Sequence, residues 1–234
     1  MQLNGSQIFV EVLCEQGVDT LFGYPGGAVL NLYDELYKNS DRITHVLTAH
    51  EQGAAHAADG YARVSGKTGV CIATSGPGAT NLVTGIANAY MDSVPVVFVT
   101  GNVPLPLIGT DSFQEVDITG ITLSVTKHNF MVKAPEELAP CLRAAFQIAN
   151  TGRKGPVLVD IPRDILEMEM PAGSDLGHAL PMRSKQIPEV DPVRLEEAVS
   201  LIDASKRPLI LAGGGIRSAG AAGILLELAR KIQA

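Results

Sequence analysis

One acidic residue stands where a strand-like run meets a helix-like run, a position that suits either a structural or a chemical role. The run reads Thr48-Ala-His-Glu51-Gln-Gly-Ala-Ala-His-Ala-Ala-Asp-Gly-Tyr-Ala-Arg63. Thr48 and Glu51 have the spacing of a capping box, in which the Glu51 carboxyl group would close the first turn of the helix. The alternative is that this carboxyl group exchanges a proton in a reaction. Taken alone, these residues favour the capping role.

Two glycine-rich turns have the composition of loops that approach a ligand closely. Gly76-Pro77-Gly78 follows a strand-like run and opens a helix, so its backbone N–H groups could face an anion or a heteroaromatic ring. The turn lacks the third glycine of the dinucleotide fingerprint and a clear acidic partner downstream, which disfavours a Rossmann site. The turn Gly213-Gly214-Gly215 is similar. A tight strand-to-helix connection explains the glycines of both turns as well as a ligand does.

The remaining reactive side chains have no recognisable metal or nucleophile pattern. The five histidines lack zinc spacing and no cysteine pair supports them, so we expect no metal ligands in this chain. No Gly-x-Ser-x-Gly motif occurs, which disfavours a serine hydrolase. Cys14, Cys71 and Cys141 are scattered within apolar runs, which indicates buried thiols in a reducing, cytoplasmic compartment.

The composition is typical of a globular protein that binds small molecules. The 234 residues are 46% hydrophobic and 18% charged, enough for one complete domain and a further piece. The net charge is −7 and no basic run occurs, which argues against nucleic acid or an anionic membrane as the main partner. We expect no transmembrane helix and no secretory signal, because no 18-residue apolar run and no basic N-terminal region occur.

Strand-like runs of valine and isoleucine alternate with helix-like runs up to residue 167. The expected strands are 18–23, 43–47, 70–74, 95–100, 127–133 and 157–161. The expected helices are 6–16, a stretch ending at 38, 50–65, one ending near 91, and 135–151. Strands that are apolar throughout are buried on both faces. The sequence therefore predicts an α/β fold, a parallel sheet with helices on both faces.

The last quarter of the chain reads as a separate piece. Residues 168–189 have no sustained period and three prolines, which is typical of a linker. Residues 190–234 read as a helix at 192–204, a strand at 208–212 and a helix at 221–232. A single strand cannot bury a sheet, so we expect the incomplete start of a second α/β domain.

Several segments together resemble one group of proteins, the thiamine-diphosphate enzymes of the acetohydroxyacid synthase (acetolactate synthase) type. The matching stretches are GYPGGA at 23–28, HEQGAAHAADGYAR at 50–63, TSGPGATN at 74–81, VPVVFVTGNVP at 94–104, GTDSFQEVDITGIT at 109–122 and GPVLVDIPRD at 155–164. HEQGA indicates the broad thiamine-diphosphate group, and GTDSFQE with IPRD narrows it to the synthase type. Residues 190–234 resemble the opening of the middle domain of that family.

The resemblance reverses the interpretation of Glu51 from a helix cap to a catalytic residue. In the family, the matching glutamate hydrogen-bonds N1′ of the aminopyrimidine, which promotes removal of the proton at C2 of the thiazolium ring. That carbon then attacks pyruvate, carbon dioxide leaves, and the remaining two-carbon unit joins a second 2-oxo acid. This is the first common step of branched-chain amino-acid biosynthesis.

The resemblance also implies residues around the cofactor and the substrates. The positions that match thiamine-diphosphate contacts are Tyr24, Pro25, Glu51, Pro77, Asn81 and Gln114. The positions that match the substrate pocket are Gly27, Ala28, Phe113, Gln114 and Arg163. Arg153 matches a contact to FAD, which is structural in the synthase. Asn102 departs from the glutamine that is commoner at its position.

The resemblance extends to partners and to chain length. In the family a third domain binds Mg²⁺ through a Gly-Asp-Gly motif, which this sequence lacks. We therefore expect the N-terminal part of a catalytic subunit, inactive by itself. The Ala/Gly-rich helix after Glu51 predicts close packing against a partner in a homodimer or homotetramer, and a small regulatory subunit is possible. The alternatives are a pyruvate oxidase, a flavin-free catabolic synthase, or a non-catalytic nucleotide- or flavin-binding module.

Overall fold

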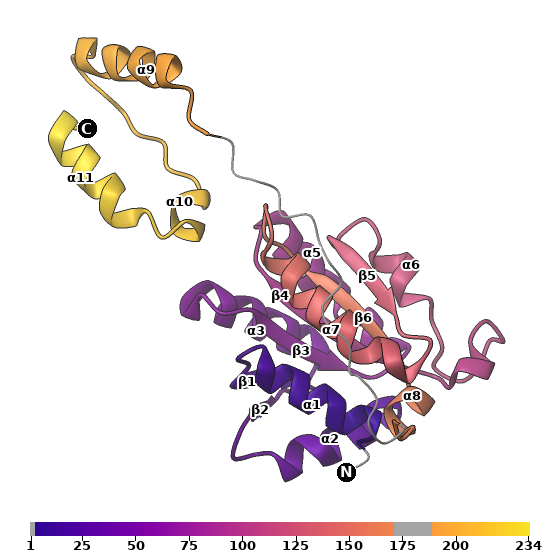
Figure 1. Cartoon of the computed structure of the whole chain (residues 1–234). Helices are drawn as coiled ribbons and strands as arrows, with labels where there is room; N and C mark the ends of the chain where they lie inside the picture. Colours follow the sequence, from indigo (N-terminus) through magenta and orange to yellow (C-terminus); the bar gives the residue numbers. More distant parts are fainter. Residues whose placement is uncertain (1–2, 171–188) are drawn as a thin grey trace. The chain divides into compact units, whose positions relative to one another are not determined.

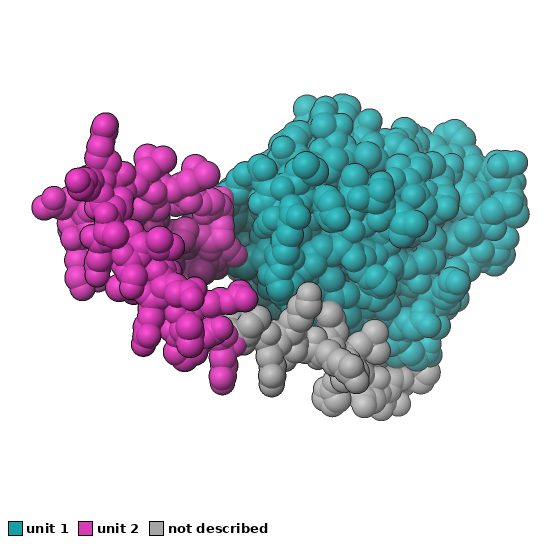
Figure 2. Space-filling model, turned by 90° about the horizontal axis from the view of Figure 1, so that it is seen from above, with its two compact units in different colours: residues 1–183 teal, residues 184–234 magenta. Residues whose placement is uncertain are grey.

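The structure is a computed structural model that describes residues 3–170 and 189–234. It divides into two compact units, residues 1–183 and 184–234, which Figure 2 shows in different colours. None of the helices in the described residues is long and apolar enough to cross a membrane.

The first unit is built on a sheet of six strands, all parallel to their neighbours. The strands are β1 (Thr20–Gly23), β2 (Thr44–Leu47), β3 (Gly69–Ala73), β4 (Val96–Asn102), β5 (His128–Met131) and β6 (Val157–Pro162). Their order across the sheet is β2-β1-β3-β4-β6-β5, and it can be followed in Figure 1. The parallel α/β sheet predicted from the apolar runs is confirmed.

Helices cover both faces of this sheet. On one face lie α1 (Gly5–Glu15), α2 (Leu30–Lys38), α7 (Pro135–Asn150) and α8 (Arg163–Glu167). On the other face lie α3 (Glu51–Ser65), α5 (Val83–Met91) and α6 (Ile118–Thr122). Short connecting turns of helix are η1 (Gly27–Val29), α4 (Pro77–Thr80) and η2 (Leu105–Leu107). Strand β3 shows the two-sided burial: Val70 and Ile72 enter one core, and Cys71 and Ala73 enter the other.

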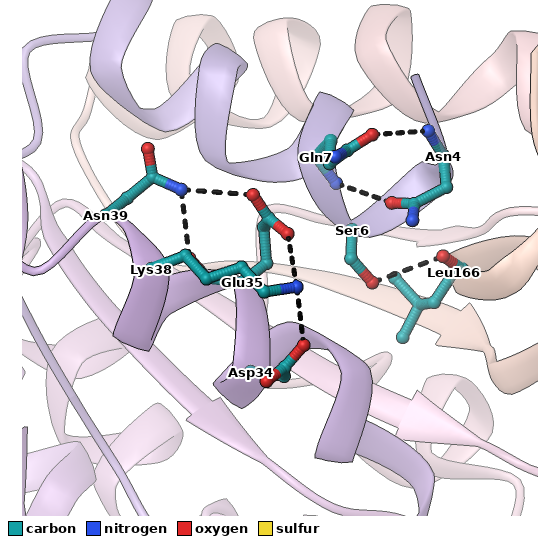
Figure 3. A network of polar contacts seen from close by, with 8 residues as sticks. All are labelled: Asn4, Ser6, Gln7, Asp34, Glu35, Lys38, Asn39 and Leu166. Carbon is teal, nitrogen blue, oxygen red and sulfur yellow. Dashed lines mark hydrogen bonds and ion pairs between the residues drawn. The ribbon is translucent and has the colours of Figure 1, made fainter. Parts of the chain in front are cut away.

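Polar contacts fix the helices of the first face at their ends (Figure 3). Asn4 and Gln7 form a reciprocal capping box at the start of α1. The Ser6 hydroxyl donates to the Leu166 carbonyl at 3.1 Å, which ties α1 to α8. Glu35 of α2 accepts from side chains further along its own helix. Of these contacts, the bond from Ser6 holds α8, which directly follows β6, against α1.

Most alanines of α3 are buried against other residues of this same chain. Ala54, Ala55, Ala58 and Ala62 are buried, and Ala55 lies so close to Gly85 of α5 that a Cβ there would overlap it. Gly53, by contrast, has open space where its Cβ would stand. Small residues on α3 therefore serve the packing of α3 on α5, and packing against a second copy stays a prediction.

The second unit contains α9 (Pro192–Ala204), α10 (Gly215–Ser218) and α11 (Ala222–Ile232) among its described residues. Asp191 caps α9 by accepting from Val193 N at 3.0 Å. The strand predicted at 208–212 is wrong, because the structure forms no ladder there. A strand needs a neighbour for its backbone hydrogen bonds, and the described part of this unit supplies none.

The linker predicted at 168–189 lies mostly outside the described residues, which omit 171–188. Its first residues are joined to the first unit, since Met168 O accepts from Gly5 N and Met170 N donates to Leu3 O.

Candidate active site

Three loops meet at the carboxyl edge of the sheet, where the chain changes direction between strands. From β1 the chain moves outward to β2 and returns to β3 on the other side of β1. In open parallel sheets, ligands bind at this kind of switch point, beyond the carboxyl ends of the strands. Tyr24, Pro25, Gly27 and Ala28 follow β1, Glu51 follows β2, and Pro77 and Asn81 follow β3. The fold therefore brings these sequence-predicted residues to one edge.

The Glu51 carboxyl group is buried and does not form the predicted capping box. His50 is the N-cap of α3, and its Nδ1 accepts from Gln52 N at 3.1 Å. Thr48 instead donates its hydroxyl to the His50 carbonyl at 2.9 Å. Glu51 is 7% exposed, and its Oε2 accepts from Asn81 Nδ2 at 3.0 Å. The capping-box interpretation is wrong because a histidine one residue before Glu51 takes the cap.

The glycines of the 76–78 turn are explained by close approach to the candidate site. A Cβ on Gly78 would lie 3.1 Å from Glu51 Oε1 and 2.7 Å from Thr74 Cγ2. Gly76 has φ +56°, a conformation that favours glycine, and a Cβ there would lie 2.5 Å from the Gln114 carbonyl oxygen. The turn thus closes on Glu51 and on Gln114 together.

Thr74 joins two loops of the site and was missed as a site residue by the sequence reasoning. Its hydroxyl oxygen accepts from Ala28 N at 3.2 Å, which connects the loop after β3 to the loop after β1. Gly26 lies directly against the Thr74 side chain. The available signal was a hydroxyl residue at the end of a buried strand next to the glycine-rich turn.

The segment 103–117 carries Phe113 and Gln114 to the same edge. Phe113 is 87% exposed, and Gln114 has φ +57°, a left-handed conformation that costs free energy for a residue with a side chain. Glu115 accepts from the backbone N–H groups of Gly109 and Ser112, and these two bonds lower the pKa of its carboxyl group. The segment is therefore a defined turn that presents an exposed aromatic side chain beside Gly76.

The two candidate arginines lie at opposite edges of the sheet. Arg163 follows β6 at the carboxyl edge and donates from Nε to Glu167 at 2.7 Å, in an exposed pair that contributes little to stability. Arg153 precedes β6 and donates to the Ser93 hydroxyl at 2.7 Å and to the Met91 carbonyl at 3.1 Å. Arg163 therefore lies at the same edge of the sheet as Glu51, and Arg153 lies at the opposite edge.

Two hollows of about 210 and 710 Å³ lie at the amino edge, away from the candidate residues. Asp19, Lys67, Thr68 and Asn150 are among the lining residues of the first. Within the described residues, no group of three or more His, Cys, Asp or Glu side chains is arranged to hold a metal ion. Two charged residues that line the first hollow, Lys67 and Asp19, form an ion pair with each other.

A second buried carboxyl group, Asp160, lies near the carboxyl end of β6. It is 0% exposed, and it accepts from Thr100 Oγ1 and Asn102 Nδ2, both at 2.6 Å. Burial raises the pKa of Asp160 to about 7, although the two donated hydrogen bonds act in the opposite direction. The sequence reasoning missed this residue, whose signal was a lone acid in an otherwise apolar strand.

The pKa of Asp160 predicts a pH dependence of stability. In the unfolded chain its carboxyl group loses a proton near pH 4, while the folded chain holds that proton up to about pH 7. Between these values the folded state binds more protons, so the Asp160 contribution makes the free energy of unfolding fall as pH rises. Chemical denaturation of the wild type and Asp160→Asn from pH 4 to 8 should show this fall only in the wild type, after subtraction of the common trend. Parallel pH profiles for the two proteins would contradict it.

Comparisons with known proteins agree with this geometry. A family profile described as "Thiamine pyrophosphate enzyme, N-terminal TPP binding domain" matches residues 3–121, just over half of the chain. The "Probable acetolactate synthase large subunit" of Methanocaldococcus jannaschii is 51% identical over 238 residues, which cover 99% of this chain and 39% of the relative. The "Acetolactate synthase large subunit" of Corynebacterium glutamicum is 51% identical over 224 residues, covering 94% and 35%. The "Acetolactate synthase isozyme 2 large subunit" of Escherichia coli is 49% identical over 225 residues, covering 96% and 40%. The chain thus spans about two fifths of the length of these relatives.

Proposed function

This chain belongs to the thiamine pyrophosphate enzymes, and on that premise we propose that it forms the pyrimidine-binding part of an acetolactate synthase large subunit. The proposed reaction is the decarboxylation of pyruvate and the transfer of the remaining two-carbon unit to a second 2-oxo acid. It would serve branched-chain amino-acid biosynthesis. The printed names of relatives that are about 50% identical over nearly the whole chain support this choice.

The observation that carries the proposal is the burial of the Glu51 carboxyl group and its contact with Asn81. It is buried at the switch point of the sheet, is not used as a helix cap, and is held by Asn81 at 3.0 Å. When bound, thiamine diphosphate supplies a nucleophilic carbon that adds to the carbonyl of a 2-oxo acid and accepts the electron pair left by carbon dioxide. A buried carboxyl group suits a heteroaromatic ring nitrogen, with which it can share a proton.

The surrounding residues support a flat ring at this edge. Asn81 holds the Glu51 carboxyl group by a hydrogen bond, and the missing Cβ atom of Gly78 lets the turn lie close to that group. In the proposal Tyr24, Pro25 and Pro77 flank the ring, and Gln114 closes the site from the segment 103–117. Gly27, Ala28 and Phe113 line the substrate side. Arg163 offers a planar cation that matches the carboxylate of a 2-oxo acid.

Further parts of the proposal concern groups beyond the ring. Mg²⁺ would neutralise the charge of the diphosphate and would be held by residues outside the described part of the chain. FAD would contact Arg153, whose guanidinium group lies over the end of α5. The name "large subunit" of the relatives supports a smaller partner subunit, and we propose a homodimer or homotetramer of this chain. Three cysteines without a disulfide support a cytoplasmic location.

The products distinguish this function from its rivals. The enzyme that carries this chain should convert pyruvate with thiamine diphosphate and Mg²⁺ to acetolactate and carbon dioxide without consuming oxygen. Oxygen consumption with acetyl phosphate or acetate as product would favour the pyruvate oxidase alternative. Full activity without bound flavin would favour the catabolic synthase. No thiamine-dependent turnover would favour a non-catalytic module.

Arg163→Met is expected to raise the KM for pyruvate about tenfold or more, with a smaller change in kcat. A charge-assisted hydrogen bond to a carboxylate contributes about 1.5–3 kcal/mol, and about 1.4 kcal/mol corresponds to a factor of ten. Steady-state kinetics would measure the change. The matched control is Glu167→Gln, which frees Arg163 from its partner and should leave KM unchanged or lower it. An unchanged KM in Arg163→Met would mean that Arg163 does not contact the substrate.

A further inference from the structure

The side-chain amide of Asn102 is oriented by a buried carboxylate. Asn102 is the last residue of β4, is buried, and donates from Nδ2 to Asp160 Oδ2 at 2.6 Å. Above about pH 7, where the Asp160 carboxyl group is ionised, both of its oxygens only accept hydrogen bonds, so it selects the NH₂ end of the amide. Oδ1 of Asn102 is thereby turned to the backbone N–H of Val103, from which it accepts at 2.8 Å. Asp160 thus acts on Val103 through Asn102.

Val103 begins the segment 103–117, and a second carboxylate holds the same end of it. Leu105 N donates to both oxygens of Asp164, at 3.2 and 3.1 Å. Asp164 lies in α8, directly after β6, so both anchors come from one short stretch of chain. Pro104, whose ring fixes φ, lies between the two anchored residues, and the turn η2 begins at the second of them, Leu105. The start of the segment therefore has little conformational freedom.

The other half of the segment lies against the candidate site. Gln114 contacts the turn at Gly76, where no side chain could fit. Asp117, at the end of the segment, caps α6 and is near enough for its charge to raise the pKa of Asp160. The segment therefore starts beside Asn102 and Asp160, passes the Gly76-Pro77-Gly78 turn, and ends at Asp117, whose charge acts on Asp160. Its placement depends on both ends.

We propose that Asp160 is a positioning residue, which acts through the Asn102 amide to fix the start of the segment 103–117 and so the placement of Phe113 and Gln114. The inference rests on the proposed function only where it treats these two side chains as substrate contacts. The claim about Val103 and the segment is independent of the reaction.

A reversed pair of side chains tests the claim. In Asp160→Leu, no acceptor remains for the NH₂ group of Asn102 or for the Thr100 hydroxyl, so the contact that holds Asn102 Oδ1 toward Val103 N is lost. Asp160→Asn alone would not test this, because the Thr100 hydroxyl can accept from the new NH₂ group and leave the new amide oxygen to Asn102. Combining Asp160→Asn with Asn102→Asp restores an acceptor for both neighbours, with the same number of carboxylates. Thr100→Val is the matched control, since it removes a hydrogen bond to Asp160 without touching Asn102.

The readout is hydrogen exchange of the Val103 and Leu105 amides in the full 234-residue chain, measured above pH 7, where Asp160 is ionised. Asp160→Leu should lower the protection of Val103 about tenfold or more, the double variant should show protection close to that of the wild type, and Thr100→Val should change it much less. Unchanged protection in Asp160→Leu, an equal loss in Thr100→Val, or a folded double variant without protection of Val103 would each overturn the proposal. If the single variant does not fold, recovery of both folding and Val103 protection in the double variant supports the proposal, and failure to recover them overturns it.

Kinetics in the enzyme that carries this chain links the positioning to the substrate. Asp160→Leu should raise the KM for pyruvate more than it lowers kcat, and the double variant should show a KM close to that of the wild type. An unchanged KM alongside lost Val103 protection would contradict the placement of Phe113 and Gln114 by Asp160. Absence of any thiamine-dependent turnover would instead refute the proposed function, while hydrogen exchange would still decide the positioning of Val103.

Discussion

Replacing Glu51 with glutamine should slow proton exchange at C2 of bound thiamine diphosphate by about 10²–10⁴-fold, the usual contribution of a positioned proton-transfer group. Glutamine keeps the size of the side chain and can still accept from Asn81, but it cannot share a proton with a ring nitrogen. Hydrogen–deuterium exchange into the C2 position of the cofactor, measured by NMR after acid quench, isolates this step from substrate binding.

The control for this substitution is Glu35→Gln. Glu35 is also buried and also accepts hydrogen bonds, but it lies on α2, and its partners are Lys38 and Asn39 at the end of that helix. Its replacement should leave the exchange rate at C2 unchanged. Equal exchange rates in the wild type and Glu51→Gln would mean that Glu51 does not act on the cofactor.

Gly76→Ala should both destabilise the chain and strongly reduce turnover. Alanine at φ +56° carries backbone strain of about 1–3 kcal/mol, and its Cβ would stand 2.5 Å from the Gln114 carbonyl oxygen. The segment with Phe113 and Gln114 must then move. A misplacement of about 1 Å at an active site can cost about 10²-fold in rate. Chemical denaturation and kcat/KM would measure the two effects.

Gly17→Ala separates backbone strain from the clash. Gly17 also has a positive φ, +75°, but no atom lies within 4 Å of the position its Cβ would take. This variant should lose about 1 kcal/mol of stability from strain alone and keep its kcat/KM. If both alanine variants lost activity equally, the contact between Gly76 and Gln114 would have no special role in the site.

The central strands β3, β4 and β6 were predictable because burial on both faces makes them largely apolar. The run predicted at 95–100 is found at Val96–Asn102, and the run at 157–161 at Val157–Pro162. The order of the strands was not predicted, since the insertion of β6 between β4 and β5 depends on packing between distant segments. The predicted strand at 208–212 had the right composition but lacks a neighbour to bond.

The candidate site shows what local patterns miss. The Thr48-x-x-Glu51 spacing predicted a cap, yet the His50 side chain caps the helix by accepting from Gln52 N, which leaves the Glu51 carboxyl group free of that role. The partner of Glu51, Asn81, lies 30 residues further along the chain, so no spacing rule could pair them. The catalytic interpretation of Glu51 came from the resemblance to a family. Thr74 and Asp160 escaped because their partners lie far along the chain: Ala28 in η1 for Thr74, and Thr100 and Asn102 on β4 for Asp160.

The central claim is that Glu51 bonds the pyrimidine ring of the cofactor, and nitrogen NMR tests it most directly. Thiamine diphosphate labelled with ¹⁵N at N1′ would be bound to the enzyme that carries this chain and to its Glu51→Gln variant. The account predicts an N1′ resonance displaced toward the protonated form in the wild type, and a return toward the free, unprotonated position in the variant. The same N1′ resonance in both bound states would contradict the account.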